Sequence, residues 1–287
     1  MTVAYAEKPK RAIRTRRIKF DYPTGSLDRH FAGGDPIMSH VVAMLSAVFP
    51  EGEDFFIRSV RHYADRITDP ELKEAVAGFT GQEVTHAREH RALNERLQDM
   101  GYPTRRLDRL VGRDLNRATR KVPPRVCLAA TAALEHYTAA LAETLLTDER
   151  ALALLGDNEV RSVLLWHAYE ESEHKAVAFD VYRAIGGTEK MRIRVMRSIT
   201  VGFLLSMTLN AILSLLADRT TYRHPGRALA SIAKLRTSPF LDKKMRQRIA
   251  AYNRVGFHPN DNDNTELLAR WSEELFGAEG RLAGNLR

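Results

Sequence analysis

The 287-residue chain is long enough to bury a full hydrophobic core, and its single cysteine excludes an intramolecular disulfide. Its formal net charge is +8, and the basic start MTVAYAEKPKRAIRTRRIK lacks the apolar core of a secretory signal, so we expect a cytoplasmic protein. No nucleic-acid-binding signature follows this start, so we expect a solvated basic arm and no nucleic-acid partner. Cys127 lies in an alanine-rich run, and we expect it to be a small buried residue rather than a nucleophile.

Apolar residues recur at helical spacing almost throughout, and no segment has the alternating β-branched pattern of a sheet. The sequence therefore predicts an all-α protein with one domain overall. We expect a basic arm and turn region at 1–34, a four-helix bundle at 35–187, and a helical extension packed on that bundle at 188–287.

Capping residues and prolines predict the helix boundaries within the bundle. The first apolar stretch runs from Ile37 to about Phe49, and Pro50 fits the first turn of a second stretch. Asp69 before Pro70 is typical of an N-cap. We expect the other helices at 70–100, 124–147 and 157–186, with a polar basic connection at 102–121.

A very apolar segment at 199–217 precedes three shorter helical patterns at 228–235, 239–252 and 265–276. The segment is just long enough to cross a hydrocarbon layer and has basic flanks. It also contains Asn210 near its centre, which neighbouring helices or a dimer partner can satisfy. Three interpretations stay open: a buried or dimer-interface helix, which we favour, contact with a membrane surface, and a membrane span.

The pattern E-x-x-H occurs twice, at Glu83–His86 and at Glu171–His174. Residues three apart on a helix share a face one turn apart, so each pair can bind adjacent sides of a metal centre. One copy alone has little meaning, because glutamate and histidine are common on helix surfaces.

A single glutamate precedes each copy of the pattern, and a turn lies between them. In each case the single glutamate and the glutamate of the copy are about equally far from that turn. Glu53 and Glu83 lie at similar distances on either side of the turn at Thr68–Asp69, and Glu135 and Glu171 flank the second loop in the same way. Glu135 also lies among alanine and leucine, where an ionised carboxylate needs a partner or a cation. Glu51 is the competing candidate for the position of Glu53.

His167 precedes Glu171 by four residues and His174 by seven, so it lies on the same stripe of the helix. His90 continues the stripe of His86 and is expected beside the ligands, whereas His62 and His136 face other directions. The predicted metal ligands are Glu53, Glu83, His86, Glu135, His167, Glu171 and His174.

This arrangement resembles the ferritin-like di-iron carboxylate proteins. The segments RRIKFDYP, FPEGEDFF, EVTHAREH, HAYEESEHKAVAFDVY and GFHP are similar to a bacterial family usually labelled predicted metal-dependent hydrolases, from about Arg16 to His258. The pattern H-x3-E-x2-H, which includes His167, is similar to that of the di-iron arylamine N-oxygenases.

Mixed carboxylate and imidazole ligation suits iron or manganese. We expect two iron ions, with manganese or a mixed pair as alternatives, in an O2-dependent oxidase or oxygenase that acts on a small hydrophobic substrate. An external reductase or ferredoxin would supply electrons, because the chain has no redox-cofactor motif of its own. The alternatives are a di-metal hydrolase with a bridging hydroxide as nucleophile, and a non-catalytic metal-binding or iron-storage bundle. We also expect a homodimer.

Overall fold

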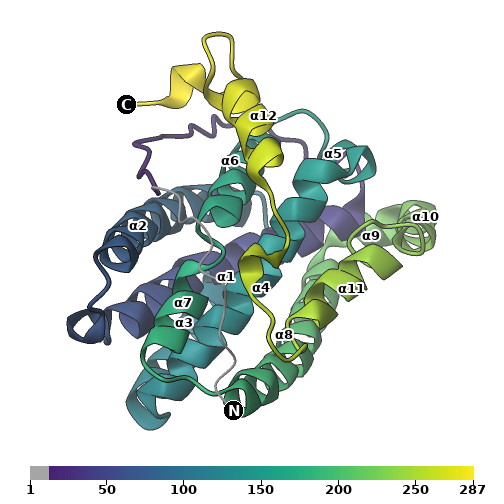
Figure 1. Ribbon diagram of the computed structural model, residues 1–287. Helices are drawn as coiled ribbons and strands as arrows, with labels where there is room; N and C mark the ends of the chain where they lie inside the picture. Colours follow the sequence, from purple (N-terminus) through teal and green to yellow (C-terminus); the bar gives the residue numbers. More distant parts are fainter. Residues whose placement is uncertain (1–12) are drawn as a thin grey trace.

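The computed structural model describes residues 13–287, and these form an all-α fold (Figure 1). The first helices are α1 (Pro36–Arg61), η1 (Ala64–Arg66), α2 (Pro70–Asp99), α3 (Thr104–Lys121), α4 (Pro124–Thr147), α5 (Glu149–Leu155), α6 (Glu159–His174) and α7 (Val177–Ala184). They are followed by α8 (Glu189–Ala217), α9 (Arg219–Arg223), α10 (Pro225–Leu235), α11 (Lys243–Ala251), η2 (Pro259–Asp261), α12 (Thr265–Phe276) and η3 (Ala283–Asn285). The prediction of an all-α protein is confirmed, whereas the ferritin-like bundle, the division into segments and the cytoplasmic location stay predictions.

Two hydrophobic clusters form the core, and a polar layer separates them. Helix α1 packs on α2 and α3, and α4 packs on α6, α7 and α8. One cluster includes Met44, Leu93 and Trp166, and the other includes Phe79 and Phe179. The chain passes from one cluster to the other along α1, along α2, and from α6 to α7, and the stretches between contain Glu53, Glu83, His86, Glu171 and His174.

Pro50 lies inside α1, so the prediction that it begins a second helix is wrong. A proline has no amide hydrogen, so the carbonyl of Ser46, four residues earlier, loses its helical donor. The side chain of Asn94 replaces that donor: its Nδ2 lies 3.0 Å from the Ser46 carbonyl oxygen. A contact from α2 therefore lets α1 continue through the proline.

The sequence-based boundaries also fail at α3 and at the end of α6. The predicted connection at 102–121 is helix α3, which packs Leu107, Val111 and Leu115 on the core at i, i+4 spacing. The predicted helix at 157–186 is interrupted after His174. There the side chain of Asn264 donates to the Ser172 carbonyl at 2.8 Å, the acceptor that a continuing helix would use.

The N-terminal segment is only partly described, because residues 1–12 of the predicted basic arm lie outside the described residues. Beyond them, the prediction of a solvated arm is wrong. Arg16 forms ion pairs with Glu170 and Glu173, at 3.0 and 2.6 Å. Ile18 and Phe20 are buried in the core, so the segment forms part of the cover over α6.

Helix α8 is longer than predicted and mostly exposed. By length and composition it is the one described helix that can cross a membrane, yet only 6% of its most apolar window is buried. The interpretation that we favoured was a buried or dimer-interface helix, and its first form, burial inside this chain, is wrong for most of the helix. The dimer and membrane interpretations stay predictions. Cys127, in contrast, is buried as expected.

Candidate metal centre

The structure brings all seven predicted ligands into the polar layer, and each side chain is buried. Helix α1 contributes one glutamate, α2 a glutamate and a histidine, α4 one glutamate, and α6 a glutamate and two histidines. The residues, none more than 3% exposed, are Glu53, Glu83, His86, Glu135, His167, Glu171 and His174. Their convergence is a geometric finding, and their role as ligands stays a prediction.

Glu171 lies at the centre of the group. Its Oε1 is 2.9 Å from His167 Nε2, 3.5 Å from His174 Nε2 and 3.7 Å from His86 Nδ1. Glu83 has a similar position, because its Oε1 is 3.1 Å from His174 Nε2 and 3.7 Å from His86 Nδ1. Each of these two carboxylates faces more than one imidazole, as expected of a group shared between two metals.

The other two glutamates lie on opposite sides of this centre. Glu53 Oε1 is 3.7 Å from His167 Nε2, and Glu135 Oε2 is 3.4 Å from His174 Nε2. Two triads have ligand atoms within 4.8 Å of one another, and they are Glu53–His86–His167 and Glu83–Glu171–His174. The donors therefore divide into two neighbouring sets.

Many of the converging atoms have no hydrogen-bond partner among the described residues. These atoms are both carboxylate oxygens of Glu53, Glu83 and Glu135, Oε2 of Glu171, Nδ1 of His86 and Nε2 of His174. Two of them, Glu83 Oε1 and His174 Nε2, lie 3.1 Å apart and form an ion pair when the imidazole is protonated. An unpaired buried polar atom costs about 1–3 kcal/mol, and more if it is charged. Cations bound between these atoms would offset that cost, so the donor set fits divalent metal ions.

Burial also shifts the protonation of the donors. It raises the pKa of the Glu53 and Glu135 carboxyls well above the usual range, and the nearby carboxylates of Glu83 and Glu171 raise both further. Burial likewise lowers the pKa of His86 well below its usual value, which favours the neutral, ligating imidazole. Metal binding would therefore release protons from the buried carboxyls.

Each of the three histidines has its other ring nitrogen held by a protein side chain. His86 Nε2 lies 3.0 Å from a Glu170 oxygen, and His174 Nδ1 lies 2.8 Å from Gln82 Oε1. His167 Nδ1 lies 2.7 Å from His90 Nε2. Such contacts fix the ring orientation and leave the second nitrogen facing the centre, as in many metal sites.

Sequence reasoning missed the support provided by Glu170, Gln82 and Arg16. Arg16 binds Glu170, and Gln82 Nε2 donates to Glu173, which also binds Arg16. Glu170 and Gln82 each directly precede a predicted ligand, but adjacent helical residues differ by about 100° in direction. Spacing along one helix therefore gave no signal for these contacts.

The chain of hydrogen bonds that holds His167 continues beyond His90. His90 Nδ1 lies 2.9 Å from Ser46 Oγ, and that hydroxyl donates to Asn94 Oδ1 at 2.8 Å. The same asparagine satisfies the Ser46 carbonyl that Pro50 leaves without a donor. The expected place of His90 beside the ligands is thus where the structure puts it.

The remaining candidates lie outside the centre. Glu51 is partly exposed and faces Arg91 at 4.0 Å, so Glu53 rather than Glu51 points inward. His62 is exposed. His136 is bound through Nε2 to the Arg248 carbonyl at 2.9 Å.

A third group of possible ligands, His30, His40 and Asp218, has a different character. Asp218 Oδ2 lies 3.2 Å from Nε2 of each histidine and 3.1 Å from an Arg29 nitrogen. Its Oδ1 accepts from the backbone and hydroxyl of Thr220. Both oxygens of Asp218 therefore already have protein partners, and one of these is the Arg29 cation. We interpret the group as a structural contact between the end of α8 and α1, with no need for a metal ion.

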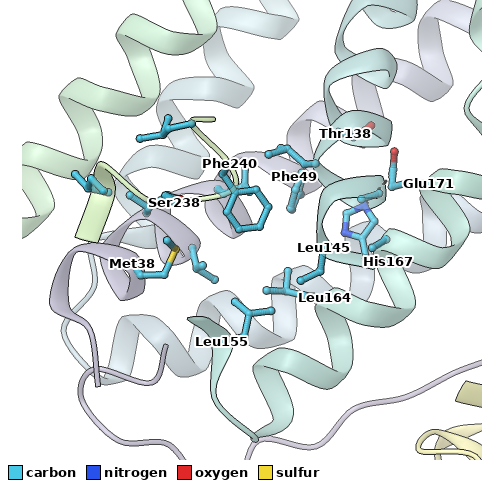
Figure 2. A pocket seen from close by; sticks show the side chains of 18 residues that line it. Met38, Phe49, Thr138, Leu145, Leu155, Leu164, His167, Glu171, Ser238 and Phe240 are labelled. Atoms are coloured by element: carbon cyan, nitrogen blue, oxygen red, sulfur yellow. Dashed lines mark hydrogen bonds and ion pairs between the residues drawn. The ribbon is translucent and has the colours of Figure 1, made fainter. Parts of the chain in front are cut away.

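An apolar cavity of about 210 Å³ reaches the centre at His167 and Glu171. Figure 2 shows these residues and Thr138 at one end, and Met38 and Ser238 at the other. A second cavity, of about 260 Å³, lies between α8, α4, α3 and α1 and reaches Glu53. An apolar molecule can therefore approach the donors from two sides.

A buried carboxylate–imidazole donor set beside an apolar cavity defines a candidate metal-dependent enzyme. The chain belongs to the family described as "Predicted metal-dependent hydrolase", whose model matches residues 14–263. No curated protein and no solved structure matched the chain. The family agrees with the predicted resemblance, and its description favours the hydrolase alternative over the oxidase that we expected first.

Proposed function

We propose that this protein is a metal-dependent hydrolase with two divalent cations at the centre. The observation that carries the assignment is the set of unpaired buried donor atoms facing one another at the end of an apolar cavity. The family description supports hydrolysis as the reaction class.

The residues divide into shared and separate donors. Glu83 and Glu171 would be shared between the two ions, because each faces at least two histidines. Glu53, His86 and His167 would complete one site, and Glu135 and His174 the other. When bound, the ions would lower the pKa of a coordinated water and polarise the oxygen of an acyl or phosphoryl group.

The cavity favours an uncharged substrate with an apolar portion. Its wall is almost entirely aliphatic and aromatic, so a charged group would lose hydration without compensation. Phe49, which lines the cavity, packs against both His90 and His167, with ring centroids 4.7 and 4.6 Å away, so an aromatic ring borders the end of the cavity at the predicted ligand. We therefore favour an ester or amide whose apolar part lies in the cavity and whose carbonyl faces His167 and Glu171.

Hydrolysis is tested with metal-free protein that is reloaded separately with zinc, manganese or ferrous iron. Aryl esters of increasing acyl length serve as substrates, and each preparation is analysed for metal content. We expect metal-dependent hydrolysis that is lost in Glu171→Gln and retained in the matched control Glu51→Gln, because Glu51 lies outside the centre. Equal rates for loaded, metal-free and Glu171→Gln protein would exclude the function.

The second candidate is an O2-dependent di-iron oxidase or oxygenase. It is favoured by the donor set itself, four glutamates and three histidines without a cysteine, which suits iron. This activity would need electrons from an external reductase or ferredoxin. Anaerobic loading with ferrous iron, followed by O2 exposure, tests it. Two irons per chain with O2 uptake and a new near-ultraviolet absorbance support it, and no O2-dependent change excludes it.

A further inference from the structure

The residues between 201 and 241 expose an unusual amount of apolar surface. Ten of the thirteen large hydrophobic side chains that are exposed among the described residues lie in this part of the chain. We call the exposed apolar side chains of residues 201–241 the α8–α10 surface. It includes Val201, Leu205, Leu209 and Leu216 of α8, Leu229 of α10, and Leu241, each at least 55% exposed. On α8, the exposed apolar residues occupy about half of the helix circumference.

The opposite face of α8 is fixed to the protein along its length. Near its start, the buried Arg192 donates to the carbonyls of Tyr252 and Arg254. Phe203 packs on Tyr137 with ring centroids 5.3 Å apart. Near its end, Ser214 Oγ lies 2.7 Å from His40 Nδ1. Helix α8 also packs along α1 and α4, so it presents one side outward, an arrangement that fits a helix lying along a membrane plane (Figure 1).

Positive charge surrounds this apolar surface. Residues 190–246 contain twelve Lys and Arg but two Asp and Glu, a net charge of +10, so the rest of the chain has a net charge of −2. Arg192 is buried and the other eleven basic residues are exposed. Of the two acidic residues, Asp218 is buried and Asp242 is half-buried. Apolar side chains bordered by exposed basic residues are typical of surfaces that bind anionic lipid.

The same charge disfavours a second copy of this chain as the partner. A symmetric dimer through this surface would bring two regions of net charge +10 together. Like charges across an interface oppose association. An anionic bilayer instead offers apolar chains to the leucines and negative headgroups to the arginines.

Both cavities border the α8–α10 surface. Leu241 is 56% exposed and also lines the cavity that reaches His167. Gly202 and Phe203 of α8 line the second cavity. Docking of this surface would therefore place the cavities beside the acyl-chain layer.

We propose that the α8–α10 surface docks on an anionic lipid bilayer, with α8 lying along the membrane plane. Flotation with vesicles tests the docking without any assay of activity. Vesicles of phosphatidylcholine with phosphatidylglycerol are compared with vesicles of phosphatidylcholine alone. The variants are Leu205→Glu combined with Leu209→Glu, and the matched control Val84→Glu, an exposed valine on α2.

We expect the native protein and Val84→Glu to bind the anionic vesicles, with binding that weakens as salt rises. The double variant should bind about tenfold less or weaker still, because two carboxylates oppose insertion and headgroup attraction. Thermal unfolding and metal content should match among all three proteins, since the substituted side chains are exposed. Absence of native binding to anionic vesicles would overturn docking. So would a stable lipid-free dimer that the double variant dissociates, because a second copy would then cover this surface.

Discussion

His90 Nε2 lies 2.7 Å from His167 Nδ1, and the opposite nitrogen of His167 lies 2.9 Å from Glu171 Oε1. The contact with His90 favours the His167 tautomer that can bind a metal, which has a proton on Nδ1 and a free electron pair on Nε2. Burial lowers the pKa of His90 well below its usual value, so His90 is neutral and its Nε2 can accept a hydrogen bond from His167 Nδ1. His90 is therefore a positioning residue for a predicted ligand.

Replacement of His90 tests this role. His90→Ala should weaken metal binding by about 10–100-fold, the usual effect of losing such a support. His90→Gln should lose less, because its amide oxygen can accept from His167 Nδ1. Equilibrium dialysis against a competing chelator measures the affinity. The control is His62→Ala, at an exposed position, and equal affinity for His90→Ala and this control would contradict the role.

The contact between Asn94 and the Ser46 carbonyl predicts a coupling with Pro50. Asn94→Ala should reduce the free energy of unfolding by about 1–3 kcal/mol, because a buried carbonyl loses its donor. In a Pro50→Ala background the restored backbone amide can satisfy the same carbonyl, so the cost should be smaller. Chemical denaturation of the four proteins of this cycle measures the difference. Additive effects would show that the two sites act independently.

The buried carboxyl of Glu135 predicts opposite effects with and without metal. In metal-free protein at pH 7, Glu135→Gln should be more stable by about 1–3 kcal/mol, because burial raises the pKa of the Glu135 carboxyl and forces it to take up a proton on folding, whereas the glutamine amide is neutral in both states. With saturating metal it should be less stable than the native protein, because a donor is missing. Thermal unfolding with chelator and with metal gives both comparisons. Glu51→Gln, at a partly exposed position, should show neither effect.

The contacts of His40 predict destabilisation in mild acid. The pKa of His40 falls from 6.5 to about 4 in the folded state, because burial and the Arg29 charge lower it and the hydrogen bond with Asp218 offsets only part of that effect. The unfolded state therefore binds the proton more tightly, and stability falls as pH drops from about 7 towards 4. Between pH 7.5 and 5 the native protein should lose about 2 kcal/mol more than His40→Gln. Denaturant unfolding at both pH values measures this, and parallel losses would contradict it.

Local sequence signals were reliable where neighbours along the chain decide the structure. Asp69 caps α2 through a bond to the Glu71 amide, and Pro70 occupies the first turn, as predicted. The helix expected at 265–276 has those bounds. The spacing of Glu83–His86 and Glu171–His174 places each pair on one helical face regardless of the rest of the fold.

The sequence by itself therefore determined the all-α class, the starts of α1, α2, α4 and α12 to within a residue, and the stripes of candidate ligands, because these follow from bonds within single helices. Only the tertiary structure decided the choice of Glu53 over Glu51, the continuation of α1 through Pro50 and the interruption after His174. These depend on side chains from other helices or segments, including Asn94 and Asn264. The exposure of α8 is likewise a tertiary outcome, since an apolar pattern records only which residues avoid water, and a protein core and a bilayer both exclude it.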